Sequence, residues 1–248
     1  MMRSVQKNMC KFAPSLSNSK HMPGTLYLVA TPIGNLEDIT HRAVRLLREV
    51  EIVACEDTRV TKTLLVAYDI HPPVLMSYFA HNELKRIPEL TLALLEGKSV
   101  ALVTDAGTPG ISDPASRLVA AAIAAGVPVV PVPGPAAAIT AIIASGLSTR
   151  RFAFEGFLPQ KKGRQTLLKK LATEERTIVI YESPHRVVGT LEDLLSFFGD
   201  RNAAVCRELT KYYEEFVRGR LSEIIAILSK RPSIKGEIVI VVQGLEES

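Results

Sequence analysis

Strand-like runs of apolar residues alternate with segments of helical periodicity along most of this 248-residue chain. The first such runs, Thr25–Ala30, Glu51–Glu56 and Val74–Phe79, are each followed by apolar residues at helical spacing. Parallel strands need long crossover connections, which helices usually provide. The alternation therefore predicts a mostly parallel sheet with helices on both faces, in which a ligand binds beyond the carboxyl ends of the strands.

The second half of the chain departs from a purely parallel pattern. Two strands follow one another directly around the sequence TKYY at 210–213, which predicts a mixed second sheet. We expect two α/β domains of the chain, N-terminal at 24–147 and C-terminal at 150–244, with the active-site cleft between them. Residues 1–23 are polar and free of acids, which predicts a disordered tail, although a transit peptide has a similar composition. Further strands are expected at Val100–Val103, Val127–Val132, Arg151–Phe157, Arg176–Glu182, Ala203–Leu209, Tyr213–Gly219 and Gly236–Val242, and helices at Glu37–Val50, Thr61–Asp69, Asn82–Gly97, Ala115–Gly126, Ala136–Gly146, Gly163–Glu175, His185–Gly199 and Leu221–Lys230.

Three loops at the carboxyl ends of predicted strands consist almost entirely of small or rigid residues. They are ATPIGN at Ala30–Asn35, TDAGTPGISDP at Thr104–Pro114 and VPGPAAA at Val132–Ala138. Glycine and proline are common in any turn, so one such loop would need no further explanation. Three of them at one edge of a sheet favour a shared ligand crevice in which main-chain groups approach the ligand directly.

Several classes of protein lack support in this sequence. There is no GxxxxGK[ST], GxGxxG or GxSxG motif, which argues against kinases, Rossmann dehydrogenases and α/β-hydrolases. The three cysteines are scattered and the five histidines form no metal-ligand cluster, so no metal is expected and a reducing cytoplasm is the simple interpretation. The segment Leu118–Leu147 holds no charged residue, but its prolines divide it into pieces too short to span a membrane.

The loops and strands together carry a family resemblance. Eight motifs occur in order between Gly24 and Gly244: LYLVATPIGNLEDIT, CEDTR, VTDAGTPGISDP, VPGPAAAITA, FEGFLP, YESPHR, RELTK and KGEIVIVV. Their order and spacing resemble the 16S ribosomal RNA (cytidine-2′-O)-methyltransferases, of the ribosomal RNA small subunit methyltransferase I type, within the tetrapyrrole-methylase superfamily. The chain departs from the family in Ala115, where glycine usually follows SDP, and in ending at Ser248, before the basic tail that several relatives carry.

The resemblance implies a function and a set of binding residues. It implies S-adenosyl-L-methionine as methyl donor, a homodimer, and as target the 2′-hydroxyl of a decoding-centre cytidine in 16S ribosomal RNA of the small ribosomal subunit, with no role for DNA or a membrane. By this resemblance the donor lies in the cleft between the domains. The residues expected to hold it are Ile33, Gly34, Asp105, Ala106, Gly107, Ile111, Ala136, Ala137, Glu182 and, within Arg207–Leu209, Glu208.

Five residues are candidates for the chemistry of methyl transfer, because a ribose hydroxyl gains from a base or from a cation that stabilises a developing alkoxide. They are Asp57, Arg59, Glu182, His185 and Arg186, all after predicted strands. Each also has a structural interpretation: Asp57 is a candidate helix cap, His185 a polar residue near a helix N-terminus, and Arg186 an ion-pair partner of Glu182. The sequence does not choose among them.

Basic residues are concentrated between Arg150 and Arg176, with eight cations against three acids. Within this segment Lys161, Lys162 and Arg164 lie in a loop-like stretch, where they are candidate contacts to RNA phosphates. A solvated helix face would show the same charge run. Two other functions stay open on the sequence: a small-molecule methyltransferase of the same fold acting on a tetrapyrrole-like substrate, and a catalytically idle RNA-binding protein.

Overall fold

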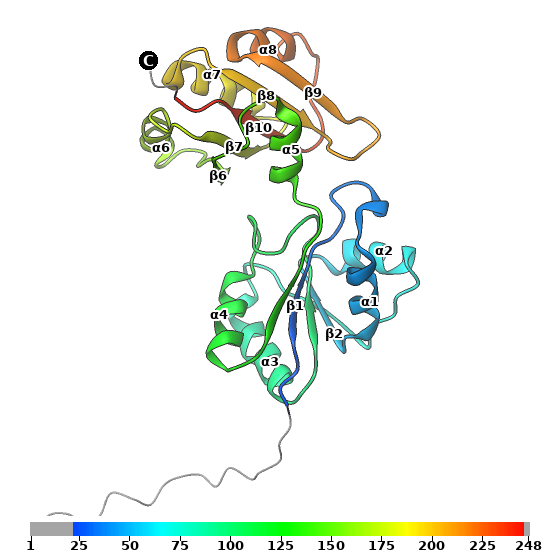
Figure 1. Ribbon diagram of the computed structural model, residues 1–248. Coiled ribbons are helices and arrows are strands. Elements are labelled where there is room, and N and C mark those ends of the chain that lie inside the picture. Colours follow the sequence, from blue (N-terminus) through cyan, green and yellow to red (C-terminus); the bar gives the residue numbers. More distant parts are fainter. Residues whose placement is uncertain (1–21, 246–248) are drawn as a thin grey trace, which may run out of the picture.

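The computed structural model describes residues 22–245, and the predicted tail at 1–23 lies outside this range except for its last two residues. Figure 1 shows two sheets, one above the other, joined by a narrow connection. The lower sheet is wholly parallel, with the strand order β3-β2-β4-β1-β5. Its strands are β1 (Leu26–Val29), β2 (Ile52–Cys55), β3 (Val74–Ser77), β4 (Val100–Leu102) and β5 (Val129–Val132).

Helices cover both faces of this first sheet, as predicted. On one face, α1 (His41–Glu49) and α2 (Thr58–Ala67) pack through Leu46, Leu47 and Leu65 against β1, β2 and β4. On the other, α3 (Glu83–Leu95) and α4 (Ser116–Ala124) contribute Leu90, Leu94 and Leu118 to a second core. The strands β2 and β4 are buried along their whole length, which explains their continuous apolar sequences.

The second sheet is mixed, which confirms the prediction. Its order is β6-β7-β10-β8-β9, with β6 and β7 parallel and the other neighbours antiparallel. One of its faces is covered by α6 (Arg164–Leu171), α7 (Val187–Phe198) and α8 (Leu221–Leu228). The strands are β6 (Phe152–Phe157), β7 (Thr177–Glu182), β8 (Asn202–Arg207), β9 (Glu215–Arg220) and β10 (Ile238–Val242).

The helix α5 (Ala137–Ser145) covers the remaining face of the second sheet (Figure 1). Its residues Ala138, Ala141 and Ile142 share a core with side chains of β7, β8 and β10. The sequence interpretation places this helix in the N-terminal domain, whereas packing groups it with the second sheet. The reason is that α5 has no acid or base along its length, so its buried side requires an apolar partner, and the second sheet provides one.

Helix starts differ from the periodicity where a polar side chain caps the helix. The predicted helix at 37–50 begins only at His41, because Thr40 Oγ1 accepts a hydrogen bond from Ala43 N at 3.1 Å, and a short 3₁₀ turn (Leu36–Asp38) precedes it. The helix α2 begins at Thr58, three residues before the apolar pattern, because Asp57 caps it. No helix within 22–245 has the length and apolar character to cross a membrane.

Candidate functional site

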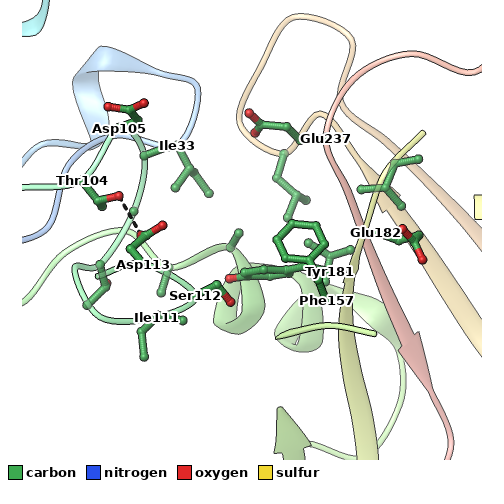
Figure 2. A pocket seen from close by; sticks show the side chains of 18 of the residues that line it. Ile33, Thr104, Asp105, Ile111, Ser112, Asp113, Phe157, Tyr181, Glu182 and Glu237 are labelled. Atoms are coloured by element: carbon green, nitrogen blue, oxygen red, sulfur yellow. Dashed lines mark hydrogen bonds between the residues drawn. The ribbon is translucent and has the colours of Figure 1, made fainter. Parts of the chain in front are cut away.

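A cavity of about 380 Å³ lies between the carboxyl-end loops of the first sheet and the edge of the second. Its size falls within the range of small-molecule sites. Figure 2 shows Ile33, Thr104, Ile111 and Asp113 on one side, and Tyr181 and Phe157 facing them. The lining residues are Ile33, Glu56, Thr104, Asp105, Ala106, Gly107, Thr108, Ile111, Ser112, Asp113, Ala136, Ala137, Phe157, Tyr181, Glu182, Ser183, Pro184, Leu209, Gly236, Glu237, Ile238 and Val239.

Close approach of two loops shapes the floor of this cavity. Thr31 and Gly107 exchange two backbone hydrogen bonds, at 2.9 and 3.0 Å, which tie the loop after β1 to the loop after β4. Gly107 has φ +88°, a conformation that costs other residues free energy, and a side chain there would contact Ile33. The glycine therefore keeps main chain, rather than side chain, at the cavity surface.

Carboxylates gather on the wall formed by the first sheet. Thr104, which is buried, donates its hydroxyl to Asp113 Oδ2 at 2.7 Å, and its Oγ1 lies 3.4 Å from Glu56 Oε2. Burial raises the pKa of Asp113, and the nearby charge of Asp105 adds to this effect. The pKa of Glu56 is raised by burial and then by the charges of Asp113 and Asp105. These groups therefore hold protons more strongly than exposed carboxyls do.

All charged residues that line the cavity are acidic. Its lining contains five acidic residues, Glu56, Asp105, Asp113, Glu182 and Glu237, and no lysine, arginine or histidine. Apolar side chains make up most of the remaining surface. A ligand with several phosphates would meet repulsion here, whereas a cationic ligand with a large apolar part would be attracted.

The structure brings together most of the residues predicted to hold a donor. Eight of them line the cavity: Ile33, Asp105, Ala106, Gly107, Ile111, Ala136, Ala137 and Glu182. Gly34 and Glu208 do not. Gly34 packs beneath the connection between β8 and β9, where a side chain would come within 2.8 Å of Thr210 Oγ1. Glu208 pairs with Lys211 at 2.9 Å, while its neighbour Leu209 reaches the cavity instead.

Four of the five candidate catalytic residues lie outside the cavity lining: Asp57, Arg59, His185 and Arg186. Asp57 caps α2 by accepting from Arg59 N at 2.8 Å, so the structural interpretation of this residue is confirmed. Hydrogen bonds from the Arg59 guanidinium and backbone lower the pKa of Asp57 to about 2. His185 is exposed.

Glu182 lines the cavity, but its carboxylate is committed to other partners. It pairs with Arg186 at 2.6 Å and accepts from Thr190 Oγ1, on α7, at 2.6 Å. Thr190 in turn accepts from Arg164, whose guanidinium also binds Asp193 at 2.8 Å. This network ties β7 to α6 and α7. Glu182, one of the five candidates from the sequence, therefore has a structural role in this network.

The same network removes Arg164 from the predicted RNA contacts. Its side chain is only 15% exposed, and it donates to Asp193, Thr190 and the carbonyl of Pro159. Lys161 and Lys162 are exposed and remain available for a phosphate. The sequence showed that the loop is basic. It did not show that Asp193, 29 residues further along the chain on α7, pairs with Arg164.

Three cavity residues, Glu56, Thr104 and Asp113, were not predicted from the sequence. All three lie within the motifs CEDTR and VTDAGTPGISDP, so the sequence already placed them in loops that follow strands of the first sheet. Their mutual contact could not be predicted, because Glu56 and Thr104 are 48 residues apart. Three further lining residues, Tyr181, Phe157 and Glu237, were not predicted either. They belong to the second sheet and its loops, and the sequence did not show which side chains of that sheet face the first one.

The chain is similar to known proteins over most of its length. The sequence model for tetrapyrrole (corrin/porphyrin) methylases matches residues 25–225. A protein of Halalkalibacterium halodurans named ribosomal RNA small subunit methyltransferase I is 52% identical, over 89% of this chain and 76% of its own length. The chain belongs to that methyltransferase family. A Thermotoga maritima protein of the same name is 49% identical over 90% of this chain and 100% of its own.

Solved structures show the fold more widely in the tetrapyrrole methylases. The uroporphyrin-III C-methyltransferase of Thermus thermophilus, solved with S-adenosylhomocysteine, matches with a TM-score of 0.62 and 22% identity, over 88% of this chain and 97% of that one. A diphthine synthase matches with a TM-score of 0.70 and 14% identity, over 89% of this chain and 90% of its own. These identities establish the shared two-sheet architecture and no more.

Proposed function

We propose that this protein transfers a methyl group from S-adenosyl-L-methionine to the ribose 2′-hydroxyl of a decoding-centre cytidine in small-subunit ribosomal RNA, in the cytoplasm. The observation that carries the proposal is an acid-lined cavity on a chain about 50% identical to ribosomal RNA small subunit methyltransferase I proteins. Decoding-centre and ribose specificity rest on the sequence resemblance.

The cavity suits this donor in size, polarity and charge. An adenosine and a methionine chain need apolar walls and main-chain hydrogen bonds, which Ile33, Ile111 and the backbone of Ala106 would provide. The donor carries a sulfonium and an ammonium, which the acidic residues of the lining would attract, although Glu237 is also paired with Lys211 at 3.2 Å. No group of three or more potential metal ligands occurs among the described residues.

Asp113 is the residue best placed to accept the hydroxyl proton. It lines the cavity, and burial raises its pKa. The hydrogen bond that Thr104 donates to its Oδ2 fixes the orientation of the carboxylate. Its charge also reaches across the cavity, where it contributes to the raised pKa of Tyr181. The donor supplies a methyl group whose carbon–sulfur bond breaks with the electron pair left on sulfur. Asp113 takes the proton as the ribose oxygen bonds to the methyl carbon.

The competing substrate class is a tetrapyrrole, as in the structural neighbours. An assay with radiolabelled donor, purified small subunits, naked 16S RNA and a uroporphyrinogen separates the two classes. We expect label in RNA and none in the tetrapyrrole. Label in the tetrapyrrole alone would refute the proposed substrate.

We also propose a homodimer, because α5 leaves an apolar outer surface. Ile139 and Ile143, one helical turn apart on α5, are 46% and 69% exposed. Pairing two copies through such a surface would remove it from water. Light scattering at micromolar concentration should give about twice the 27.1 kDa of one chain. A single-chain mass would count against the dimer.

A further inference from the structure

A second cavity, of about 520 Å³, lies at the other end of the second sheet from the donor cavity. Thr177 and Gln243, at the far ends of β7 and β10, line it, whereas Glu182 and Ile238, at the opposite ends of these strands, line the donor cavity. Five residue rises along β7 separate the two by about 17 Å. We call it the arginine cavity, lined by Gly146, Leu147, Ser148, Arg150, Arg151, Glu175, Arg176, Thr177, Asn202, Gln243 and Gly244.

The charges of the arginine cavity are opposite to those of the donor cavity. Three arginines line it, Arg150, Arg151 and Arg176, against a single acid, Glu175. Arg176 is held by Glu174 through two hydrogen bonds of 2.7 Å, from Nε and from a terminal nitrogen. This ion pair fixes the guanidinium and neutralises it, so the remaining charge of the lining comes from Arg150 and Arg151 against Glu175 and is positive.

Arg150 and Arg151 have no bound acid within the described part of the chain. Both are exposed, and neither forms an ion pair or a side-chain hydrogen bond there. Arg151 lies close enough to Glu174 that its charge contributes, after the larger effects of Arg176, to holding the pKa of this carboxyl at about 2. The two arginines therefore stand beside a fixed Arg176–Glu174 pair, free to bind an anion.

The two anionic oxygens of a phosphodiester match the guanidinium groups of this cavity. A guanidinium presents parallel N–H donors that fit two phosphate oxygens at once and does not lose its charge at any physiological pH. The donor cavity holds carboxylates only, so phosphates of an RNA substrate must be neutralised elsewhere on the protein. The arginine cavity lies at the strand ends of the second sheet and has the charge to do so.

We propose that the arginine cavity binds a phosphodiester of the RNA substrate, with Arg150 and Arg151 as its ligands. The proposal rests on RNA being the substrate, and it extends the RNA contacts beyond Lys161 and Lys162. Binding there holds the RNA by its backbone at a second point, about 17 Å from the donor cavity. Such a contact adds affinity without selecting a base.

The test compares two double variants that remove the same charge. Arg150→Ala/Arg151→Ala removes the free guanidiniums, whereas Lys169→Ala/Lys170→Ala removes two exposed cations of α6 outside the cavity. Binding of a small-subunit RNA fragment is measured across a series of salt concentrations. We expect the arginine variant to bind at least about tenfold more weakly and to lose up to about two units of log–log salt slope. The lysine variant should change much less.

Two further measurements make the outcome specific. Arg150→Lys/Arg151→Lys keeps the charge but not the fork, and should recover only part of the affinity. Donor binding by calorimetry and thermal unfolding should match the wild-type protein in every variant, because neither arginine has an internal partner. Equal losses in the arginine and lysine variants, or unchanged RNA binding in the former, would overturn the arginine cavity while leaving the methyltransferase function in place. A wild-type protein that neither binds nor methylates small-subunit RNA would overturn both.

Discussion

Asp113→Asn is expected to lower kcat for methyl transfer by about 10²- to 10⁴-fold, the usual contribution of a positioned base. Asparagine preserves the shape of the side chain and an oxygen that accepts the 2.7 Å hydrogen bond from Thr104. It takes up no proton, so the ribose hydroxyl loses its acceptor. Donor affinity, measured by calorimetry, should stay within severalfold of the wild-type value.

The pH dependence separates this role from a structural one. Transfer requires ionised Asp113, so kcat should rise with pH, with a midpoint above the ordinary carboxyl value of 3.8 because burial raises the pKa. Groups facing this carboxyl are Thr104, Asp105, Glu56 and, from the second sheet, Tyr181. Asp105→Asn removes a charge that raises the pKa, so it should move the rising limb to lower pH.

Glu56→Gln is the matched control for the acidic wall. Its carboxylate lies 3.4 Å from the Thr104 oxygen, so it serves as a neighbour of the Thr104–Asp113 pair. We expect it to lose much less activity than Asp113→Asn. If Asp113→Asn keeps kcat within threefold, or if Glu56→Gln is the more damaged variant, Asp113 is not the proton acceptor.

Ala136→Leu should abolish detectable donor binding, a loss of at least about a hundredfold or roughly 2.7 kcal/mol. Ala136 lines the donor cavity at the start of α5 with extended backbone (φ −146°, ψ 111°), so leucine fits the main chain without strain. Its added carbons then occupy space that the donor needs. Gly107→Val should have the same effect, with added backbone strain at φ +88°.

The control for these variants is Ala124→Leu, which adds the same bulk to an exposed position of α4. It should leave both calorimetric affinity and thermal unfolding unchanged. Ala136→Leu should also unfold near the wild-type temperature, since the cavity is open space. Wild-type donor affinity in folded Ala136→Leu would contradict the assignment of this cavity as the donor site.

The sequence was sufficient for most of the fold, because local signals agree with packing there. Uninterrupted apolar runs at β2 and β4 are buried from both faces, and the paired strands around TKYY do form an antiparallel pair, β8 and β9. The placement of α5 could not be read in this way. A helix with so few polar residues is expected to pack against an apolar surface, but its sequence does not show against which sheet.

Main-chain features of the site were predictable and side-chain pairings were not. Gly107 and Ala136 line the cavity as expected. Both lie in loops of small residues that follow strands, and such loops can be recognised from the local sequence alone. The partners of Glu182 lie on α7, and Arg164 finds its acid, Asp193, 29 residues away. Whether a charged side chain is free or paired within the protein depends on such distant contacts. The residues proposed from the sequence therefore included both free side chains, such as Lys161, and paired ones, such as Arg164.

Mass mapping of 16S ribosomal RNA at nucleotide resolution would show which atom of which nucleotide this protein methylates. Small subunits lacking the modification would be incubated with S-adenosyl-L-methionine and either the wild-type protein or Asp113→Asn. We expect one added methyl group, on the ribose 2′-oxygen of a decoding-centre cytidine, with the wild-type protein and almost none with the variant. A methyl group on a base, or unmodified RNA after treatment with donor-binding wild-type protein, would contradict this expectation.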